Sequence, residues 1–328
     1  MKHCFIINPA AGNANPDMCK ESIEKICVGR NIEYRIDFSA AEGDIDRLAY
    51  EAANNGFKYI YAVGGDGTLN EVANGIMRYI DAAEMLSETD TPVMVPVPCG
   101  TGNDFVRSID KNGVYRKYID SMNKKSKTSE SFHTVLAELI ESAVDSSENV
   151  EMLDVGIANG RYFINIASVG FDAEVVINAK KYKKKKFIPS GMAYIVGVFT
   201  TFISLKPRYV KISYDDSGFG DENITLMAVA NGKYYGGGVM PAPDADLKDG
   251  KLDVCTVDFV RRYMVPIFFP KYNKGRHGSM KQVTFRKCEK IVITAETPFA
   301  FNVDGEVSFE TRGEFEICKN KIPMAIIK

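Results

Sequence analysis

The sequence predicts an α/β domain followed by a β-rich domain, and two patterns carry that prediction. In the first hundred residues, apolar runs typical of buried strands alternate with amphipathic helical stretches. From residue 150 onward, short strand-like runs follow one another directly, separated by turn residues. Alternating strands and helices build a parallel sheet, whereas closely spaced strands build a sandwich or barrel. We therefore predict a doubly wound α/β domain over residues 1–128 and a β-sandwich domain over 129–317.

The elements follow from the position of each apolar run. In the first domain we expect strands at 3–7, 33–38, 59–63 and 93–97, with helices at about 16–27, 42–54 and 68–82. Residues 111–147 break the alternation with charged and small residues. We interpret them as a linker or insertion with an amphipathic helix near 132–144. The second domain has strand-like runs at 152–157, 162–167, 209–213, 224–229, 252–254, 283–285 and 291–293.

Composition narrows the function classes. The chain has 328 residues, 45% of them hydrophobic and 26% charged, and its formal net charge is −2. A chain with this net charge has no overall positive potential that would attract nucleic acid, so we expect no nucleic-acid partner. The seven cysteines are scattered without CxxC spacing, which favours the reducing cytoplasm over a disulfide or zinc framework. No apolar run approaches the roughly 18 residues of a spanning helix, so we expect a soluble or membrane-peripheral protein.

A glycine-rich turn between a predicted strand and helix is the first candidate site. Residues 64–72 read GGDGTLNEV, and Gly64, Gly65 and Gly67 allow backbone amides to approach a ligand beside a helix N-terminus. That arrangement favours phosphate. Asp66 would repel phosphate, so we expect it to face a divalent cation, a ribose hydroxyl or a positioned water. The alternative is an ordinary tight turn with Asp66 as a capping residue.

Two more loops resemble phosphate-binding turns. Residues 8–12 read NPAAG and follow the first predicted strand, and residues 98–105 read PCGTGNDF and follow the fourth. Because the carboxyl ends of parallel strands share one edge of a sheet, Asn8, Ser39, Gly64 and Pro98 should converge there. Each loop alone is also compatible with a plain connection. Asp104 could simply cap a helix, and Arg107, one turn further on, is either a surface residue or a phosphate clamp.

The predicted second domain contains three charged features. Residues 180–186 hold six lysines in seven positions, either a solvated face or a contact for anionic lipid headgroups, and an apolar run at 192–199 follows. Asp244, Asp246, Asp249 and Asp253 form an oxygen-rich loop that suits a hard divalent cation or is a polar turn. Residues 302–306 read NVDGE, a hairpin turn whose two acidic residues could be merely exposed. The three histidines have no partner motif, so histidine catalysis has little support.

These motifs together resemble the diacylglycerol kinase catalytic-domain family, in its bacterial soluble lipid kinase branch related to sphingosine kinases. The segments GGDGTLNEV, PCGTGNDF, NPAAG, GGGVMPAPDADLKDGKLDV (236–254) and VDGE (303–306) occur in the family's order and leave out roughly residues 108–148. NAD kinases and, loosely, phosphofructokinases share GGDGT alone. Two departures are the long insertion at about 110–148 and the variable motif positions of Cys99 and Gly102, which blur the identity of the acceptor.

The resemblance implies a nucleotide site, a base and metal ligands. The α/β domain would be NAD kinase-like or phosphofructokinase-like, residues from about 318 to 328 would return to it, and the active site would lie in the cleft between the domains. Asp66 and Asp104 would organise Mg2+ and the acceptor hydroxyl, and Glu306 would be the general base. A structural Mg2+ would be held by Asp246, Asp249 and Lys251, the last through its carbonyl. ATP would be bound by Asn8, Ser39, Gly64, Gly65, Asp66, Gly67, Thr68, Leu69, Asn70 and Thr101.

The leading hypothesis is therefore an ATP- and Mg2+-dependent lipid kinase. It would phosphorylate diacylglycerol or a similar lipid alcohol in phospholipid biosynthesis, as a cytoplasmic protein peripheral to the inner face of an anionic membrane. Phosphoryl transfer needs phosphate donors, metal and little covalent chemistry, and the motifs supply that inventory. Two alternatives stay open, an NAD kinase-like kinase of a soluble hydroxyl acceptor and a non-catalytic lipid- or nucleotide-binding module. A homodimer is also open, and the sequence does not fix which lipid accepts the phosphate.

Overall fold

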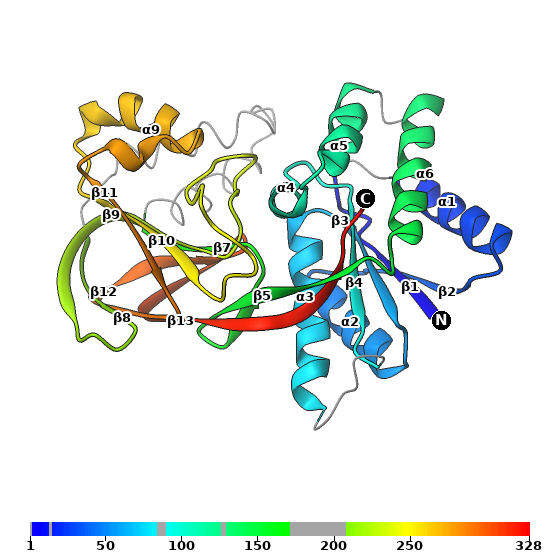
Figure 1. Cartoon of the computed structure of the whole chain (residues 1–328), viewed down its shortest axis with the longest axis horizontal. Helices are drawn as coiled ribbons and strands as arrows, with labels where there is room; N and C mark the ends of the chain where they lie inside the picture. Colours follow the sequence, from blue (N-terminus) through cyan, green and yellow to red (C-terminus); the bar gives the residue numbers. More distant parts are fainter. Residues whose placement is uncertain (1, 13–14, 84–89, 126–128, 171–207) are drawn as a thin grey trace. The chain divides into compact units, whose positions relative to one another are not determined.

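The computed structural model describes residues 2–12, 15–83, 90–125, 129–170 and 208–328. It divides the chain into two compact units, one formed by residues 1–155 with 319–328 and the other by residues 156–318. The first unit is the predicted α/β domain and the second is the predicted β-rich domain, and Figure 1 colours both along the sequence. Within the described residues, no helix is long and apolar enough to cross a membrane.

The first unit is built on a parallel sheet. Its strands β1 (Lys2–Ile7), β2 (Glu33–Phe38), β3 (Tyr59–Gly64) and β4 (Val93–Pro98) lie in the order β4-β3-β1-β2. Phe5 pairs with Tyr61, and Tyr61 pairs with Val95. Every residue of β3 and β4 is buried, as expected for central strands covered on both faces. All four predicted strands of this domain are present within a residue or two of the expected bounds.

Helices cover this sheet in two groups. Helix α2 (Asp44–Asn54) packs against α3 (Asp66–Ala82), whereas α1 (Pro16–Gly29) and α5 (Val114–Lys124) pack against α6 (Glu130–Asp145). Figure 1 shows the two groups on either side of the strands. The amphipathic helix predicted near 132–144 is α6, whereas the interpretation of residues 111–147 as a linker or insertion missed α5. Because α6 buries Phe132, Leu136 and Leu139 within the first unit, residues 129–155 lie there and not with the β-rich residues.

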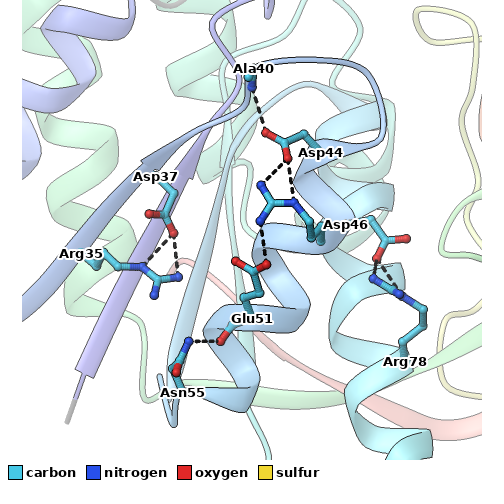
Figure 2. Close-up of polar contacts among 9 residues, drawn as sticks. Arg35, Asp37, Ala40, Asp44, Asp46, Glu51, Asn55 and Arg78 are labelled. Atoms are coloured by element: carbon cyan, nitrogen blue, oxygen red, sulfur yellow. Dashed lines mark hydrogen bonds and ion pairs between the residues drawn. The ribbon is translucent and has the colours of Figure 1, made fainter.

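Ion pairs and hydrogen bonds link exposed side chains of α2 to one another and to its neighbours. Asp44 accepts hydrogen bonds from the Ala40 backbone N–H and from Arg47, and Arg47 also reaches Glu51 one turn further on. Figure 2 shows these contacts, together with Arg78 of α3, whose Nε donates to Asp46 of α2 at 2.9 Å. Exposed pairs of this kind contribute little individually, about 0.2–1 kcal/mol. They help fix the register of α2 against α3 and the start of α2 beside Ala40.

The second unit is predominantly antiparallel. Its strands are β6 (Arg161–Phe163), β7 (Ile166–Gly170), β8 (Arg208–Tyr214), β9 (Gly220–Ala230), β10 (Leu252–Asp258), β11 (Val283–Cys288), β12 (Lys290–Val303) and most of β13 (Glu306–Ala325). Both β7 and β8 pair with β9 and with β12, so these four strands close on themselves. The pairing of β12 with β13 is irregular between Thr294 and Phe299. This irregularity lets β12 bend, so that its first part pairs with β8 and its last part with β7. The enclosed core includes Phe163, Phe299, Phe301 and Phe315.

A second apolar cluster lies under α9 (Val265–Asn273), which the short 3-10 turns η1 (Arg262–Met264) and η2 (His277–Ser279) flank. Val265, Phe268 and Tyr272 of α9 are buried against Leu226 and Val257 of the sheet. The sequence analysis did not predict α9, because its two prolines and the neighbouring strand-like runs hide the helical period.

Two strands cross the boundary between the units. β5 (Val150–Ala158) passes from the first unit into the second, and β13 returns from the second into the first. In the first unit β13 lies parallel to β4, with Met324 paired to Met94. Asn149 fixes this last stretch, since its backbone and side chain exchange hydrogen bonds with Ile326. Residues 319–328 thus complete the sheet of a unit that begins three hundred residues earlier.

Candidate active site

Three loops meet at the carboxyl edge of the parallel sheet. The Asn8 backbone N–H donates to the Val63 carbonyl at 3.1 Å, and the Cys99 N–H donates to the Gly64 carbonyl at 2.7 Å. The Asn8 side-chain amide donates to the Thr68 hydroxyl at 2.9 Å. These bonds tie the loops after β1, β3 and β4 to one another, as the shared edge of parallel strands predicts.

Glycine is needed where the loops touch. A Cβ on Gly100 would lie 2.4 Å from the Cα of Gly65, and a Cβ on Gly64 would lie 2.3 Å from the Thr68 hydroxyl oxygen. Real Cβ atoms do not approach other atoms so closely, so a side chain on Gly100 would push two loops apart and one on Gly64 would displace Thr68. Gly67 differs, because it is exposed and a Cβ there would meet nothing within 4 Å. The open side of the turn is therefore at Gly67.

Helix α3 begins at this turn with its N-terminus towards the loops. It has 17 residues. Its N-cap residue is Gly65, so no N-cap side chain accepts a hydrogen bond from the first backbone N–H groups. The first backbone N–H groups of a helix and its dipole attract anions. Leu69 and Asn70, both predicted nucleotide contacts, are each 2% exposed. The Leu69 side chain belongs to the apolar core, so only its backbone could face a ligand.

Asp66 and Asp104 approach the same spot from two loops. A Cβ on Gly102 would lie 2.9 Å from Asp66 Oδ2 and 3.4 Å from Asp104 Oδ2, so both carboxylates face the same glycine. Asp66 Oδ1 accepts the Phe105 N–H at 2.9 Å. Burial raises the pKa of Asp66, while the backbone N–H groups of Phe105 and Asp104 and the Arg107 cation act in the opposite direction. Paired carboxylates of this kind suit a divalent cation.

Arg107 is held inside this loop. Its Nη2 donates to the Gly102 carbonyl at 3.1 Å, and its Nε lies 3.8 Å from Asp104 Oδ1. The side chain remains 36% exposed, which leaves part of the guanidinium open to a ligand. Of the two alternatives, the contacts favour a residue of the site over an unattached surface residue.

Asn103 organises the same loop, and the sequence analysis missed its role. Its backbone has φ of 50°, in the left-handed region that asparagine tolerates better than most residues. Its side-chain oxygen accepts the Gly100 N–H at 3.0 Å, and its side-chain nitrogen donates to the Gly100 carbonyl at 2.9 Å. Both polar groups of Gly100 are thereby fixed where that glycine touches Gly65.

The remaining predicted nucleotide contacts also lie at this edge. Ser39 follows β2 and donates its N–H to the Ile7 carbonyl at 3.1 Å. Thr101 is exposed, with its methyl group beside Gly12. A hollow of about 630 Å³ in this unit lies instead at the amino ends of the strands, lined by His3, Glu33, Tyr59 and Glu148 among others. No glycine loop reaches that hollow, so the candidate site is at the carboxyl edge.

Glu306 lies in the second unit, at the start of β13. It follows the turn residues Asp304 and Gly305, whose φ angles are 46° and 97°. The Asp304 carboxylate accepts backbone N–H groups from residues 164, 165 and 166, at 2.8–3.2 Å, so Asp304 fastens the turn and is not a loose surface acid. The Glu306 side chain is 43% exposed and forms an ion pair with Arg161 of β6. It is thus held in place yet open to solvent.

The acidic loop before β10 is organised by its own backbone and by lysines. Asp246 accepts the Lys248 N–H at 3.1 Å, and Asp249 accepts the Lys251 N–H at 3.0 Å. The second oxygen of Asp249 lies 2.6 Å from Lys287 Nζ, which also lies 3.2 Å from Asp253.

Oxygen donors fit Mg2+ by type, although here Lys287 supplies the positive charge beside Asp249. Across the part of the chain that the structure describes, no three His, Cys, Asp or Glu side chains are grouped to hold a metal.

The lysine run at 180–186 and the apolar run at 192–199 lie outside the described residues. His3 is buried against the Tyr61 hydroxyl, 2.8 Å away, and His277 is buried beside the Pro241 carbonyl at 3.1 Å. Both of these histidines have structural partners.

Comparison with known proteins matches both units. Residues 2–135 match the diacylglycerol kinase catalytic domain, and residues 165–325 match the YegS C-terminal NAD kinase beta sandwich-like domain. A diacylglycerol kinase of Bacillus subtilis (strain 168) is 30% identical over 281 residues, which cover 83% of this chain and 79% of that protein. A diacylglycerol kinase of Staphylococcus haemolyticus (strain JCSC1435) is 26% identical over 336 residues, covering 100% of this chain and 89% of that one.

The fold is also that of a solved structure. A crystal structure of a diacylglycerol kinase from Bacillus anthracis str. Sterne superposes with a TM-score of 0.67 at 20% identity, covering 100% of this chain and 97% of that one. The glycine loops, the facing carboxylates and the two domain matches lead to one assignment. The chain belongs to the diacylglycerol kinase family and is a phosphotransferase.

Proposed function

We propose that this protein is a lipid kinase that transfers the γ-phosphate of ATP to the hydroxyl of diacylglycerol or a similar lipid alcohol. The observation that carries the proposal is the meeting of three glycine loops around Asp66 and Asp104, beside the N-terminus of α3. Such a site offers phosphate donors and metal ligands without a nucleophile for covalent catalysis. The relatives named as diacylglycerol kinases support the lipid acceptor.

In this proposal the first unit binds the nucleotide. Gly64, Gly65, Gly67 and Thr68 present backbone N–H groups to the phosphates, and Asn8 holds the Thr68 hydroxyl in place. Ser39, Leu69, Asn70 and Thr101 line the rest of the nucleotide site. Asp66 and Asp104 would hold Mg2+, which when bound offsets negative charge on the phosphate oxygens. Asp246, Asp249 and the backbone carbonyl of Lys251 would hold a second, structural Mg2+ if Asp249 exchanged its contact with Lys287.

In this proposal the second unit supplies the general base and binds the lipid. Glu306 takes the proton of the acceptor hydroxyl as that oxygen bonds to the γ-phosphorus, and the bond from the γ-phosphorus to the β,γ-bridging oxygen breaks to release ADP. Arg161 orients the Glu306 carboxylate. We also propose that the enzyme works at an anionic membrane surface, where its substrate resides. Whether it does so as a homodimer is a question for sedimentation analysis.

The test is a transfer assay with radiolabelled ATP against a panel of acceptors. In mixed micelles, label should appear in diacylglycerol, or in another lipid of a panel with undecaprenol, sphingosine and phosphatidylglycerol. Label in NAD alone would reject the lipid assignment. ATP binding without transfer to any acceptor would favour the non-catalytic module.

Glu306→Gln tests the base directly. Turnover should fall roughly 10²-fold or more, in the range of a lost general base, while ATP affinity stays near that of the unmodified enzyme. Glu316→Gln is a matched control, because Glu316 is exposed on the same strand β13. Equal turnover in the two variants would reject Glu306 as the base.

An NAD kinase-like activity is the second candidate. It is favoured by the match of residues 165–325 to a domain described as NAD kinase beta sandwich-like. This candidate requires transfer to NAD in the absence of detergent or vesicles. The acceptor panel therefore separates the two kinases in one experiment.

A further inference from the structure

One stretch of the second unit is strongly basic, although the chain as a whole is not. Residues 259–281 contain six lysines and arginines and no aspartate or glutamate, whereas the full chain has a net charge of −2. We call this stretch, which includes η1, α9 and η2, the α9 surface. Its cationic residues are Arg261, Arg262, Lys271, Lys274, Arg276 and Lys281.

The inner face of α9 fixes the helix firmly. The ring centroids of Phe268 and Tyr272 are 5.3 Å apart, and those of Tyr272 and His277 are 4.7 Å apart. The Tyr272 hydroxyl lies 3.0 Å from the Tyr235 hydroxyl. These buried aromatic contacts hold the helix against the sheet, and Figure 1 shows α9 outside the strands of its unit. The other face of α9 is thereby turned to solvent.

Large apolar side chains are exposed along the α9 surface, one of them, Ile267, on α9 itself. Tyr263 is 69% exposed, Ile267 is 61% exposed and Phe259 is 40% exposed. A single exposed apolar side chain needs no explanation, but here three gather within nine residues of sequence. Apolar and aromatic side chains mixed with lysine and arginine are typical of a helix that lies in the surface layer of a membrane.

Five cations of the α9 surface form no ion pair with the residues that the structure describes. Arg261, Lys271, Lys274, Arg276 and Lys281 are all exposed. Within the described part of the chain, the ion pairs of lysine and arginine involve other residues and none of these five. The nearest acidic residue in sequence is Asp258, at the edge of the stretch. The α9 surface is thus complementary in charge to an anionic partner.

We propose that the α9 surface docks this protein on anionic lipid bilayers. The five exposed cations contact the headgroups, and Tyr263 and Ile267 enter the boundary between headgroups and acyl chains. The proposal rests on the proposed function in one respect, because docking would bring the kinase to a lipid substrate. It does not depend on the lysine run at 180–186.

Vesicle binding tests the proposal without reference to catalysis. The full chain would be sedimented with vesicles of phosphatidylcholine containing phosphatidylglycerol, and with vesicles of phosphatidylcholine alone. The triple variant Lys271→Gln, Lys274→Gln, Arg276→Gln should bind the anionic vesicles at least about 10-fold more weakly, since each cation near such a surface contributes measurably. The double variant Tyr263→Ser, Ile267→Ser should bind several-fold more weakly.

A matched triple variant in the first unit controls for net charge. Lys25→Gln, Lys117→Gln, Lys124→Gln removes the same charge from exposed positions of α1 and α5 and should bind like the unmodified protein. The proposal is overturned if the α9 triple variant binds as well as this control. Unchanged vesicle binding with altered oligomeric state in sedimentation velocity would overturn it too, since the α9 surface would then contact a second copy.

Activity on a dispersed short-chain diacylglycerol separates this proposal from the proposed function. The α9 variants should keep that activity, since no membrane is involved, and lose it on anionic vesicles. Absence of transfer in every protein, with the difference in vesicle binding preserved, would reject the kinase assignment and leave the docking surface intact.

Discussion

His3 shows how burial sets the behaviour of a single residue. It is 7% exposed at the amino end of β1, with its Nδ1 2.8 Å from the Tyr61 hydroxyl. Burial, aided by the nearby N-terminal charge, lowers the pKa of His3 from 6.5 to about 4. The folded protein therefore holds this imidazole neutral at pH values where the unfolded chain protonates it. Stability from this group is complete above pH 6.5 and decreases as the pH falls towards 4.

Replacing His3 by glutamine should remove that pH dependence. The contribution of His3 predicts that the unmodified protein loses about 2 kcal/mol of unfolding free energy between pH 7 and pH 5 beyond other effects. His3→Gln should lose less over the same interval, even if it is less stable at pH 7. Urea titrations followed by circular dichroism at the two pH values measure the difference. Parallel losses in the two proteins would contradict the prediction.

Among elements, α2 and α3 show how closely two helices can pack. A Cβ on Gly75 of α3 would lie 2.3 Å from the Asp46 carbonyl oxygen and 2.6 Å from the Ala49 Cβ, both on α2. The absence of a side chain at residue 75 lets the helices approach, and Arg78 bridges them at the surface (Figure 2). Since α3 also starts at the Gly64–Thr68 turn, this packing positions the candidate nucleotide site.

Gly75→Ala should therefore destabilise the protein, although alanine favours helices. The added methyl group must displace α2, and overpacking of this kind costs about 1–3 kcal/mol against a helix-propensity gain of about 1 kcal/mol. Gly29→Ala is the control, because Gly29 ends α1 and a Cβ there meets nothing within 4 Å. Thermal unfolding of both variants would measure the effect. If Gly75→Ala melts no lower than Gly29→Ala, the close packing of α2 against α3 does not require glycine at residue 75.

The elements also show what sequence alone can predict. The strands at 59–63 and 93–97 are uninterrupted apolar runs, and the meeting of their loops follows from the geometry of parallel strands. The structural role of Asn103 could not be predicted, because its two hydrogen bonds to Gly100 depend on a left-handed backbone conformation that no local sequence pattern indicates. The carboxylate of Asp304 was similarly hidden, since its three backbone donors lie about 140 residues away in sequence.

For the whole molecule, the main feature is the discontinuous first unit. Its sheet includes the end of β13, where Ile322 and Met324 are fully buried. Asp154 accepts the Asn320 N–H at 2.7 Å just where the chain enters the first unit. Core positions of the α/β unit are thus filled by residues that follow the entire β-rich unit in sequence. Substitutions at these positions should therefore destabilise the whole first unit and not only the strand that contains them.

Ile322→Ala tests that expectation. Truncating a fully buried isoleucine costs about 2–5 kcal/mol, and the loss should appear as faster amide exchange in β3 and β4. Phe309→Ala lies on the same strand but removes a side chain that is 64% exposed, so exchange in β3 and β4 should not change. Hydrogen–deuterium exchange with mass spectrometry resolves these peptides. Faster exchange confined to residues 156–318 in Ile322→Ala would contradict the discontinuous unit.

The return of β13 has a consequence for how the protein is made. A ribosome translates residues 1–155 early, yet residues 319–328 emerge only after the whole of residues 156–318. Until then the edge of β4 that β13 will occupy has no strand beside it, and an open strand edge invites pairing with other nascent chains. The β-rich unit, whose segment 156–318 is continuous, can complete its core sooner. During synthesis the unit encoded first should be the last to mature, which makes it the natural client of co-translational chaperones.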